Sequence, residues 1–319
     1  MMTDVQAALP PDLRGPDTTV VPISGGLSGA GVWRVEAPGQ PPLALKIWSA
    51  AEPLARWRRA LRVVERAAEA GLAPRVVHRD EALRAVVSEF VTQPFVAFYG
   101  NPATRAAALV LLAQALRRVH ALPIDAIGES APEPRTLLAD EWLPVEAAAE
   151  VPSFICATVE RSLALEAPPL ERARVLSHND ANPGNIVVDG ERLLLVDWDH
   201  AGPNDPYYDL ATVAVFLGMD EDACARLLAT YDDAPLSPLP ARFQYVRQLI
   251  ATLGGVRFLG MAFAKGDIRA GLPSSLEEAL PLIEFYQRLR TGAVSLATAE
   301  GLSLFGLALL RQGVQQRLP

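Results

Sequence analysis

The first part of the chain alternates short apolar runs with turn residues, which is the pattern of a β-rich region. The runs are rich in valine and other β-branched or aromatic residues, and glycine, proline and polar clusters separate them. This pattern predicts strands over residues 18–23, 32–35, 43–48, 74–77 and 85–91. One stretch between them has a helical period instead: it runs from Pro53 to Ala70, and Gly71 follows it in the position that commonly ends a helix.

The pattern changes in the remaining two thirds of the chain, where longer alanine- and leucine-rich stretches predominate. Asn101-Pro102 provides a favourable helix start. The stretches predict helices over residues 106–120, 155–168, 210–231, 241–264, 276–290 and 292–316, with proline-rich loops at 123–134 and 235–240. We therefore predict an α+β fold with two lobes: a small lobe with an antiparallel sheet at residues 1–92 and a larger helical lobe at 93–319.

A β-hairpin is predicted near the middle of the chain. Two apolar runs, at 186–188 and 193–196, flank Asp189-Gly190, a dipeptide typical of two-residue hairpin turns. Because the strands of a hairpin are antiparallel, the ends away from the turn meet. Asn185 and Asp197 occupy those ends, so we expect them to lie close together.

The residues around this hairpin suggest phosphoryl transfer. His178-Asn179-Asp180 begins an H-x-D-x-x-x-x-N pattern that ends at Asn185. Phosphoryl transfer needs a carboxylate to orient the attacking hydroxyl, a role that suits Asp180, and hard oxygen ligands for Mg²⁺, which Asn185 and Asp197 can provide. The five-residue spacing from Asp180 to Asn185 is that of kinase loops. A polar loop followed by an ordinary hairpin is the alternative, but the combination of motif and hairpin favours the chemical interpretation.

A glycine-rich segment and a lysine strand near the N-terminus fit the same chemistry. Glycines allow backbone N–H groups to approach phosphates closely, and Lys46 on the predicted strand would reach the phosphates as a point charge. The candidate phosphate contacts are Ser24, Gly25, Gly26, Ser28 and Gly29. Taken alone, a hairpin turn and a solvated edge lysine are the more common interpretations, and the downstream motifs favour the functional one.

Kinases also need a glutamate that holds this lysine. Glu65 on the predicted helix is the candidate and Glu69 the second choice, with a solvated glutamate as an equal alternative. The segment after the last strand of a kinase small lobe contacts the adenine mostly through its backbone. We therefore expect nucleotide contacts at Glu89 and Val91, within the segment from Glu89 to Thr92.

Four further residues are expected to support the reacting groups or the acceptor. Asp209 opens a predicted helix and can cap it, brace the loop that carries Asp180, or both. His178 belongs to the same loop and is expected to support it. Asp199 and Asp205 could face a cationic acceptor or simply lie in turns.

Composition excludes several classes of function. The formal net charge is −8 and the isoelectric point about 5.2, which disfavours a nucleic-acid binder. Cys156 and Cys224 lack the spacing of a zinc site or a disulfide framework and suggest a reducing compartment. The sequence contains no signal-peptide pattern and no run of 18 apolar residues, so we expect a cytoplasmic protein without a membrane span.

The segment SHNDANPGN followed by LLLVDWDHAGPNDPYYDLA resembles the phosphotransferase enzyme family of small-molecule kinases. This family includes aminoglycoside phosphotransferases, choline and ethanolamine kinases and thiamine kinase. The upstream segments GGLSGAGVWRVE, LALKIW, AGLAPRVV and LRRVHALP are similar to the family as well. The D-W-D and N-D-P-x-x-D-L-A segments resemble the choline-kinase side more than the antibiotic-kinase side.

The resemblance implies a protein-kinase-like fold with two lobes, with ATP and Mg²⁺ as cofactors. It implies that Asp180 is the catalytic base, that Asn185 and Asp197 bind Mg²⁺, and that Lys46 clamps the phosphates, which the segment Ser24–Gly29 covers. Two departures from the family pattern concern the phosphate contacts and the lysine partner: Gly29 stands where an asparagine is common, and the small-lobe glutamate is in no clear register.

The predicted activity is transfer of the γ-phosphate of ATP to a hydroxyl of a small molecule, most naturally choline, ethanolamine or a similar amino alcohol. An aminoglycoside or other antibiotic kinase is one alternative, and a nucleotide-binding regulatory module without turnover is another. An acidic cluster, Asp220–Asp222, could attract a cationic acceptor, although a solvated helix end explains it more simply. The same applies to a possible aromatic cage for a quaternary ammonium, whose candidate residues are Trp142, Tyr207, Tyr208, Tyr231 and Tyr245.

Overall fold

The computed structural model describes residues 2–23, 31–124, 132–148, 150–235, 238–266 and 268–315. The chain divides into two compact units, each made of two chain segments. Unit 1 contains residues 1–129 and 183–203, and unit 2 contains residues 130–182 and 204–319. The division into lobes at residue 92 that we predict from the sequence stays a prediction.

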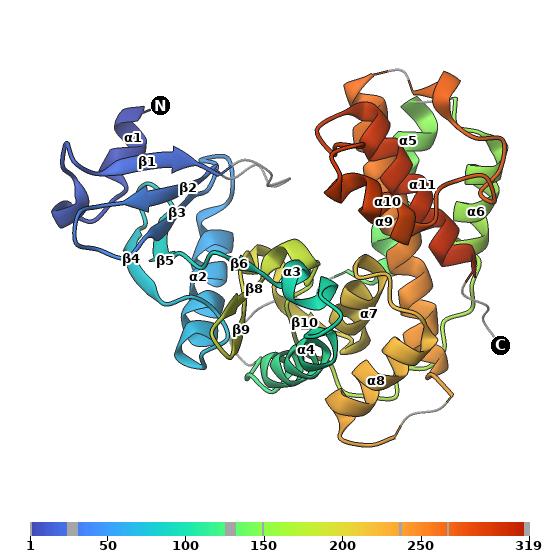
Figure 1. Cartoon of the computed structure of the whole chain (residues 1–319), viewed down its shortest axis with the longest axis horizontal. Coiled ribbons are helices and arrows are strands. Elements are labelled where there is room, and N and C mark those ends of the chain that lie inside the picture. The colour runs from blue at the N-terminus through green and yellow to red at the C-terminus, as the bar shows by residue number, and fades with distance from the viewer. Residues whose placement is uncertain are drawn as a thin grey trace. The chain divides into compact units, whose positions relative to one another are not determined.

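An antiparallel sheet forms the centre of unit 1 (Figure 1). Within the described residues its strands lie in the order β1-β2-β3-β5-β4, and neighbouring strands pair antiparallel. The strands are β1 (Thr19–Pro22), β2 (Gly31–Glu36), β3 (Leu43–Ile47), β4 (Val76–Asp80) and β5 (Ala85–Glu89). The predicted antiparallel sheet is therefore confirmed, with each strand within a few residues of its expected place.

Helices cover both faces of this sheet. On one face Leu45 and Val87 pack with Leu9 and Leu13, which belong to the segment of α1 (Met2–Ala7) and η1 (Pro11–Leu13). On the other face Val86 packs with Trp57 and Ala60 of α2 (Leu54–Glu69). Side chains alternate between the faces of a strand, so residues in register with Val86 point toward α2.

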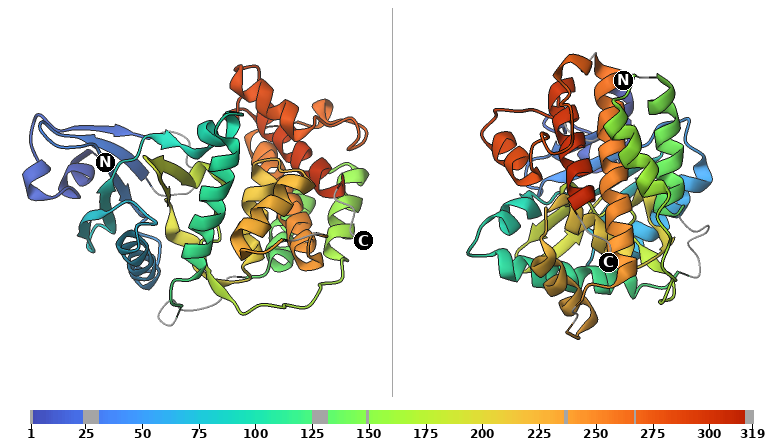
Figure 2. Two further views of the ribbon diagram at one scale, coloured as in Figure 1. Left: turned by 60° about the horizontal axis from the view of Figure 1, so that its bottom comes forward. Right: turned by 90° about the vertical axis from the view of Figure 1, so that its right-hand side faces the viewer.

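The predicted hairpin also belongs to unit 1. Strands β8 (Ile186–Asp189) and β9 (Arg192–Leu195) pair antiparallel, and β6 (Gln93–Pro94) pairs with β8. The helix α4 (Arg105–His120) lies beside β9 (Figure 2). A backbone hydrogen bond of 2.8 Å from the Leu195 N–H to the Leu72 carbonyl joins β9 to the turn after α2. The remaining elements of the unit's described residues are α3 (Phe95–Gly100), η2 (Pro183–Asn185) and η3 (Trp198–His200).

Unit 2 is built around the long helix α9 (Ala241–Lys265), which packs against α5, α7 and α11 (Figure 1). These helices are α5 (Pro134–Ala148), α7 (Tyr207–Phe216) and α11 (Ala299–Gln315), and α6 (Ser153–Leu163), α8 (Glu221–Asp232), η4 (Arg269–Gly271) and α10 (Leu282–Arg290) complete the described helices of the unit. The short strand β7 (Val175–Ser177) precedes the loop of Asp180, and β10 (Gly202–Asn204) spans the junction between the two units. Among the described residues, no helix is both long and apolar enough to cross a membrane.

Several helix boundaries differ from the sequence-based expectation. The stretch that we predict to be helical over 210–231 contains two helices, because Gly218 adopts a positive φ of 62° that ends α7. The first ends at Phe216, beside the end expected at Leu217 for the helix that Asp209 opens. The predicted helix 276–290 begins at Leu282, directly after Pro281 at its N-cap. The helix α5 was not predicted, and Pro144 inside it removes a backbone donor and weakens the helical pattern.

Glycines allow α9 and α11 to approach closely. A Cβ atom added at Gly306 would lie 2.8 Å from the carbonyl oxygen of Gly255 and 2.9 Å from Cγ of Leu259. A Cβ added at Gly255 would lie 2.9 Å from the carbonyl oxygen of Gly306. Backbone atoms cannot rotate away as side chains can, so a larger residue at either position must separate the helices.

We expect Gly306→Val to lower the free energy of unfolding by about 2–3 kcal/mol, because it overpacks a tight helix crossing. Gly100→Val is the matched control, since a Cβ at Gly100 meets no atom within 4 Å and the substitution should change stability by at most about 0.5 kcal/mol. Urea unfolding of both variants measures the difference. Equal stabilities of the two variants would contradict the proposed close packing of α9 and α11.

Candidate active site

The two predicted metal ligands lie at the open end of the hairpin. Ile186 pairs with Leu195, and the N–H of Val196 donates to the carbonyl of Asn185 over 2.9 Å. This bond brings the residues just outside the strands together, as the sequence predicts. Asp197 adopts a left-handed backbone conformation with φ of 65°, which aspartate tolerates better than most residues.

Lys46 connects the sheet to this hairpin. It pairs in register with Val32 and Val86 and therefore points to the face of the sheet that α2 covers. Its Nζ donates to Oδ1 of Asp197 over 2.5 Å and to Oδ2 of Asp199 over 2.6 Å. The three side chains are mostly buried, with exposed fractions of 19%, 26% and 17%. Hydrogen bonds between charged groups at this burial are among the stronger ones in proteins.

The segment between the two aspartates is fixed by Trp198. Its indole Nε1 donates to the carbonyl of Leu195 over 2.9 Å, and its side chain is buried. The pKa of Asp199 is raised to about 6, chiefly because the carboxyl group is buried and further because of the nearby charge of Asp197, while Lys46 acts in the opposite direction. The ion pair with Lys46 thus favours the charged form of Asp199 against the effect of its burial.

The loop that carries Asp180 lies in unit 2 and is held by Asp209. The buried Asp209 carboxylate accepts hydrogen bonds from the backbone N–H groups of His178, at 2.7 Å, and Asn179, at 2.9 Å. Asn204 donates to the side-chain oxygen of Asn179 over 2.8 Å. The amide of Asn182 donates to Oδ1 of Asp180 over 2.9 Å, which orients the carboxylate. The loop is thus fixed at its start and at its functional side chain.

Asparagine residues provide much of this support, and three of them were not expected from the sequence as parts of the site: Asn179, Asn182 and Asn204. Asn179 adopts a positive φ of 62°, a conformation in which asparagine is enriched. Asn182 precedes a proline and Asn204 lies two residues before one. These pairings are turn signals, but they do not reveal which side chains the asparagines contact.

Asp205, a predicted acceptor contact, is buried and paired with Arg242, whereas a contact with an acceptor requires an accessible side chain. Its carboxylate accepts from Nε of Arg242 over 2.8 Å and from the N–H of Tyr207 over 2.9 Å. The side chains of Asp205 and Arg242 are each 7% exposed. A buried and hydrogen-bonded ion pair of this kind stabilises the start of α7, and the acceptor contact at Asp205 stays a prediction.

Glu65, the predicted partner of Lys46, contacts Arg79 on β4 instead.

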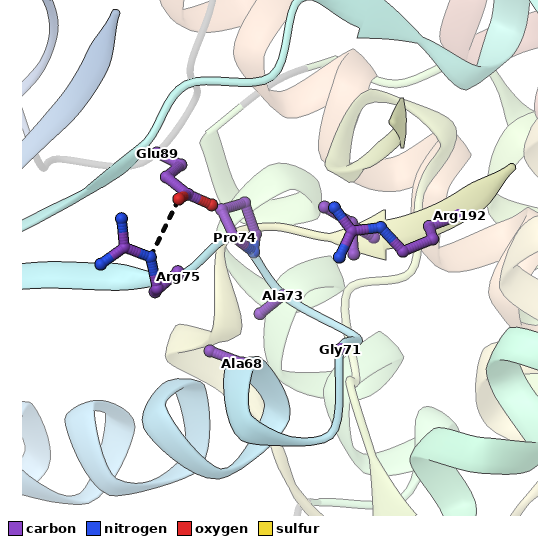
Figure 3. Close-up of a pocket in the computed structure, with 8 residues that line it drawn as sticks. Ala68, Gly71, Ala73, Pro74, Arg75, Glu89 and Arg192 are labelled. Carbon is purple, nitrogen blue, oxygen red and sulfur yellow. Dashed lines mark hydrogen bonds and ion pairs between the residues drawn. The ribbon is translucent and has the colours of Figure 1, made fainter. Parts of the chain in front are cut away.

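The predicted nucleotide contact Glu89 accepts a hydrogen bond from Nε of Arg75 over 2.9 Å (Figure 3). It lines a hollow of about 300 Å³ that is bounded by the end of α2, the turn before β4, and β9. Val91 is half-buried. The nucleotide contacts at Glu89 and Val91 stay predictions. The predicted phosphate loop, with Ser24, Gly25, Gly26, Ser28 and Gly29, lies outside the described residues.

The donor set at the hairpin fits magnesium. Asn185 and Asp197 offer an amide and a carboxylate, both hard oxygen ligands. Within the described ranges, no cluster of three or more histidine, cysteine, aspartate or glutamate residues could form a metal site by itself. Mg²⁺ typically binds one or two protein oxygens together with substrate phosphates and water. Two protein ligands, Asn185 and Asp197, are therefore sufficient for this ion.

Comparison with known proteins identifies the family. A model of the phosphotransferase enzyme family matches residues 19–246, well over half of the chain, so the family resemblance and the predicted phosphotransferase class are confirmed. Protein LicA of Haemophilus influenzae is 39% identical over 54 residues, which cover 17% of this chain and 20% of LicA. The match therefore spans about a fifth of the length of that relative.

Solved structures share the fold over nearly the whole chain. A choline/ethanolamine kinase family protein from Mesorhizobium loti is 21% identical, with a TM-score of 0.60 and coverage of 98% of this chain and 99% of that protein. A putative aminoglycoside phosphotransferase from Ralstonia eutropha JMP134 is 13% identical, with a TM-score of 0.62 and coverage of 99% and 98%. The predicted protein-kinase-like fold is confirmed, and at these identities the similarity extends to the fold alone.

We expect Asp209→Ala to lower the free energy of unfolding by about 3 kcal/mol, because two backbone N–H groups lose a charged acceptor. Turnover should fall at least about tenfold, because the loop that positions Asp180 loses its support. Asp80→Ala is the control: it removes a single bond from the N–H of Leu83 and should cost about 1 kcal/mol with turnover retained. Unfolding curves and steady-state kinetics of both variants, compared at a temperature where both are folded, separate the two effects. Full turnover in the Asp209 variant would contradict the bracing role.

Proposed function

We propose, from the premise that the chain belongs to the phosphotransferase enzyme family, that it transfers the γ-phosphate of ATP to a hydroxyl group of a small molecule in a Mg²⁺-dependent reaction. The observation that carries the proposal is the ion pair between Lys46 and Asp197. It joins the candidate phosphate-binding cation to the hairpin that carries both candidate metal ligands. A kinase needs these groups on one nucleotide.

The proposed roles follow from the chemistry of each side chain. Asn185 and Asp197 would hold Mg²⁺, which when bound would spread the negative charge of the phosphate oxygens. Lys46 would contact the same phosphates as a point charge. Asp180 would orient the acceptor hydroxyl and accept its proton as the oxygen attacks the γ-phosphorus and the bond to the β-phosphate oxygen breaks. The hydrogen bond from Asn182 supports the orientation of this carboxylate.

The acceptor that we propose is choline, ethanolamine or a similar amino alcohol. The support for it is the D-W-D and N-D-P-Y-Y-D-L-A segments at 197–199 and 204–211, which resemble choline kinases. The aromatic residues considered for a cage give no support, because all five are buried: Trp142, Tyr207, Tyr208, Tyr231 and Tyr245. The cytoplasmic location stays part of this proposal.

An aminoglycoside or other antibiotic acceptor is the alternative within the same chemistry. The two solved structures named above share the fold, although one is a choline/ethanolamine kinase family protein and the other a putative aminoglycoside phosphotransferase, so the fold does not distinguish between the acceptors. A regulatory module without turnover is the third hypothesis. Retention of Asp180, Asn185 and Asp197 in the sequence argues against it.

A panel of hydroxyl compounds, scored by acceptor-dependent ADP formation with Mg·ATP, tests the proposal. We expect amino alcohols to stimulate ADP formation at least about tenfold over the acceptor-free rate and aminoglycosides and macrolides to give little stimulation. Stimulation by antibiotics alone would support the alternative. Nucleotide binding without stimulation by any member of a broad panel would support the regulatory module.

The variant Asp180→Asn tests the role of the base. We expect it to lower turnover by about two to four orders of magnitude, because it removes the proton acceptor while keeping the size of the side chain. Binding of Mg·ATP, measured by calorimetry, should stay within about threefold of wild type. Turnover comparable to wild type would refute the assignment of Asp180.

A further inference from the structure

We infer that Asp199, rather than a glutamate on helix α2, is the residue that positions Lys46 for the nucleotide phosphates. The inference rests on the proposed function, because it concerns the same lysine. It assigns to Asp199 a positioning role that acts through Lys46.

The glutamates of α2 are not placed to hold Lys46, because they lie over another part of the sheet. Within α2, acidic residues occur only at Glu65 and Glu69, both in the C-terminal half of the helix. Glu65 contacts Arg79, and Arg79 pairs with Val86, which in turn pairs with Lys46. Glu65 therefore lies over a strand two positions away from the strand of Lys46, about 10 Å across the sheet at the usual strand spacing.

The N-terminal half of α2, which is nearer to the lysine site, is basic. It carries Arg56, Arg58 and Arg59. The positive charge of Arg56 acts on Asp199, and α2 contacts η3, the short helix that contains Asp199. This end of the helix thus provides positive charge beside the ion pair, and the carboxylate that precedes the helix, Glu52, pairs with Arg56 over 2.8 Å.

Asp199 is well placed to provide the carboxylate that positions Lys46. Its Oδ2 lies 2.6 Å from Nζ of Lys46, and its side chain is 17% exposed. Trp198, buried and hydrogen-bonded to the carbonyl of Leu195, anchors the turn so that Asp197 and Asp199 both reach the lysine. The position of the carboxylate is set by the hairpin and does not require a particular position of α2.

We expect the two aspartates to change their contacts with Lys46 differently when a magnesium-bound nucleotide binds. Asp197 is a candidate Mg²⁺ ligand, so binding of the ion would draw its carboxylate away from Lys46. A mostly buried ammonium group then needs another counter-charge to keep its place. Asp199 supplies it, and the lysine can direct its remaining hydrogens toward the phosphates.

A double-mutant cycle on Mg·ATP affinity, measured by calorimetry on the full-length chain, tests this inference. We expect Asp199→Asn to weaken binding about tenfold in the wild-type background and by less than about twofold in the Lys46→Met background, because the effect passes through the lysine. Asp199→Glu, which restores a carboxylate, should return affinity to within about threefold of wild type. The control Asp189→Asn, at the exposed turn of the same hairpin, should leave affinity unchanged.

Multiplicative effects of the Asp199 and Lys46 substitutions would overturn the inference, because Asp199 would then act independently, for example on the metal. It would also be overturned if Glu65→Gln showed the loss and the coupling to Lys46 expected of Asp199→Asn. Failure of wild type to bind Mg·ATP at all would instead refute the proposed function.

A second measurement needs neither nucleotide nor activity. Carbodiimide couples a lysine to a carboxylate that is in direct contact with it. The lysines of this chain are Lys46 and Lys265, so few cross-linked peptides have to be distinguished. In the Asp197→Asn variant we expect a cross-link between Lys46 and Asp199, located by mass spectrometry. A cross-link from Lys46 to Glu65, or none from Lys46 to Asp199, would contradict the inference.

Discussion

The ion pair between Lys46 and Asp197 is the interaction on which the rest of the candidate site depends. The two residues are 151 positions apart in the chain, and their side chains meet at 2.5 Å. The pair forms because the β8–β9 hairpin belongs to the same compact unit as the antiparallel sheet, where the hydrogen bond from Leu195 to Leu72 secures it. Lys46, the candidate phosphate-binding residue, and the candidate metal ligands are therefore held in one folded unit before any ligand binds.

The second unit holds the other half of the predicted chemistry. Its contribution is the loop of Asp180, which two hydrogen bonds to the Asp209 carboxylate fix at the backbone. Buried N–H groups that donate to a carboxylate leave little freedom to the loop. On the proposed function, the two units separate the tasks: one would provide charges for the nucleotide phosphates, and the other orients the carboxylate that would serve the acceptor.

Local patterns in the sequence were sufficient to predict the hairpin and the strand of Lys46. The Asp189-Gly190 turn and the apolar runs beside it specify register locally, and register alone brings Asn185 and Asp197 together. The partner of Lys46 was not predictable in this way. Whether Glu65 can reach the lysine depends on which strand lies beneath it, and that is decided by the pairing order across the whole sheet.

Side-chain contacts of the polar loops were likewise beyond the sequence. The bond from Asn182 to Asp180 and the bond from Asn204 to Asn179 depend on a left-handed backbone at Asn179 and on long-range folding. The helix α5 escaped prediction because Pro144 obscures its pattern, although packing against α9 stabilises it. In both cases tertiary contacts decide between alternatives that local propensity leaves open.

We propose that Asn185, Asp197 and Lys46 together form one site for a metal-bound nucleotide. The most direct test is the affinity for ATP with and without Mg²⁺, measured by calorimetry for wild type and for Asp197→Asn. We expect Mg²⁺ to strengthen ATP binding at least about tenfold in wild type and to have little effect on it in the variant. An affinity that is independent of Mg²⁺ in wild type, or a magnesium effect that survives in Asp197→Asn, would contradict it.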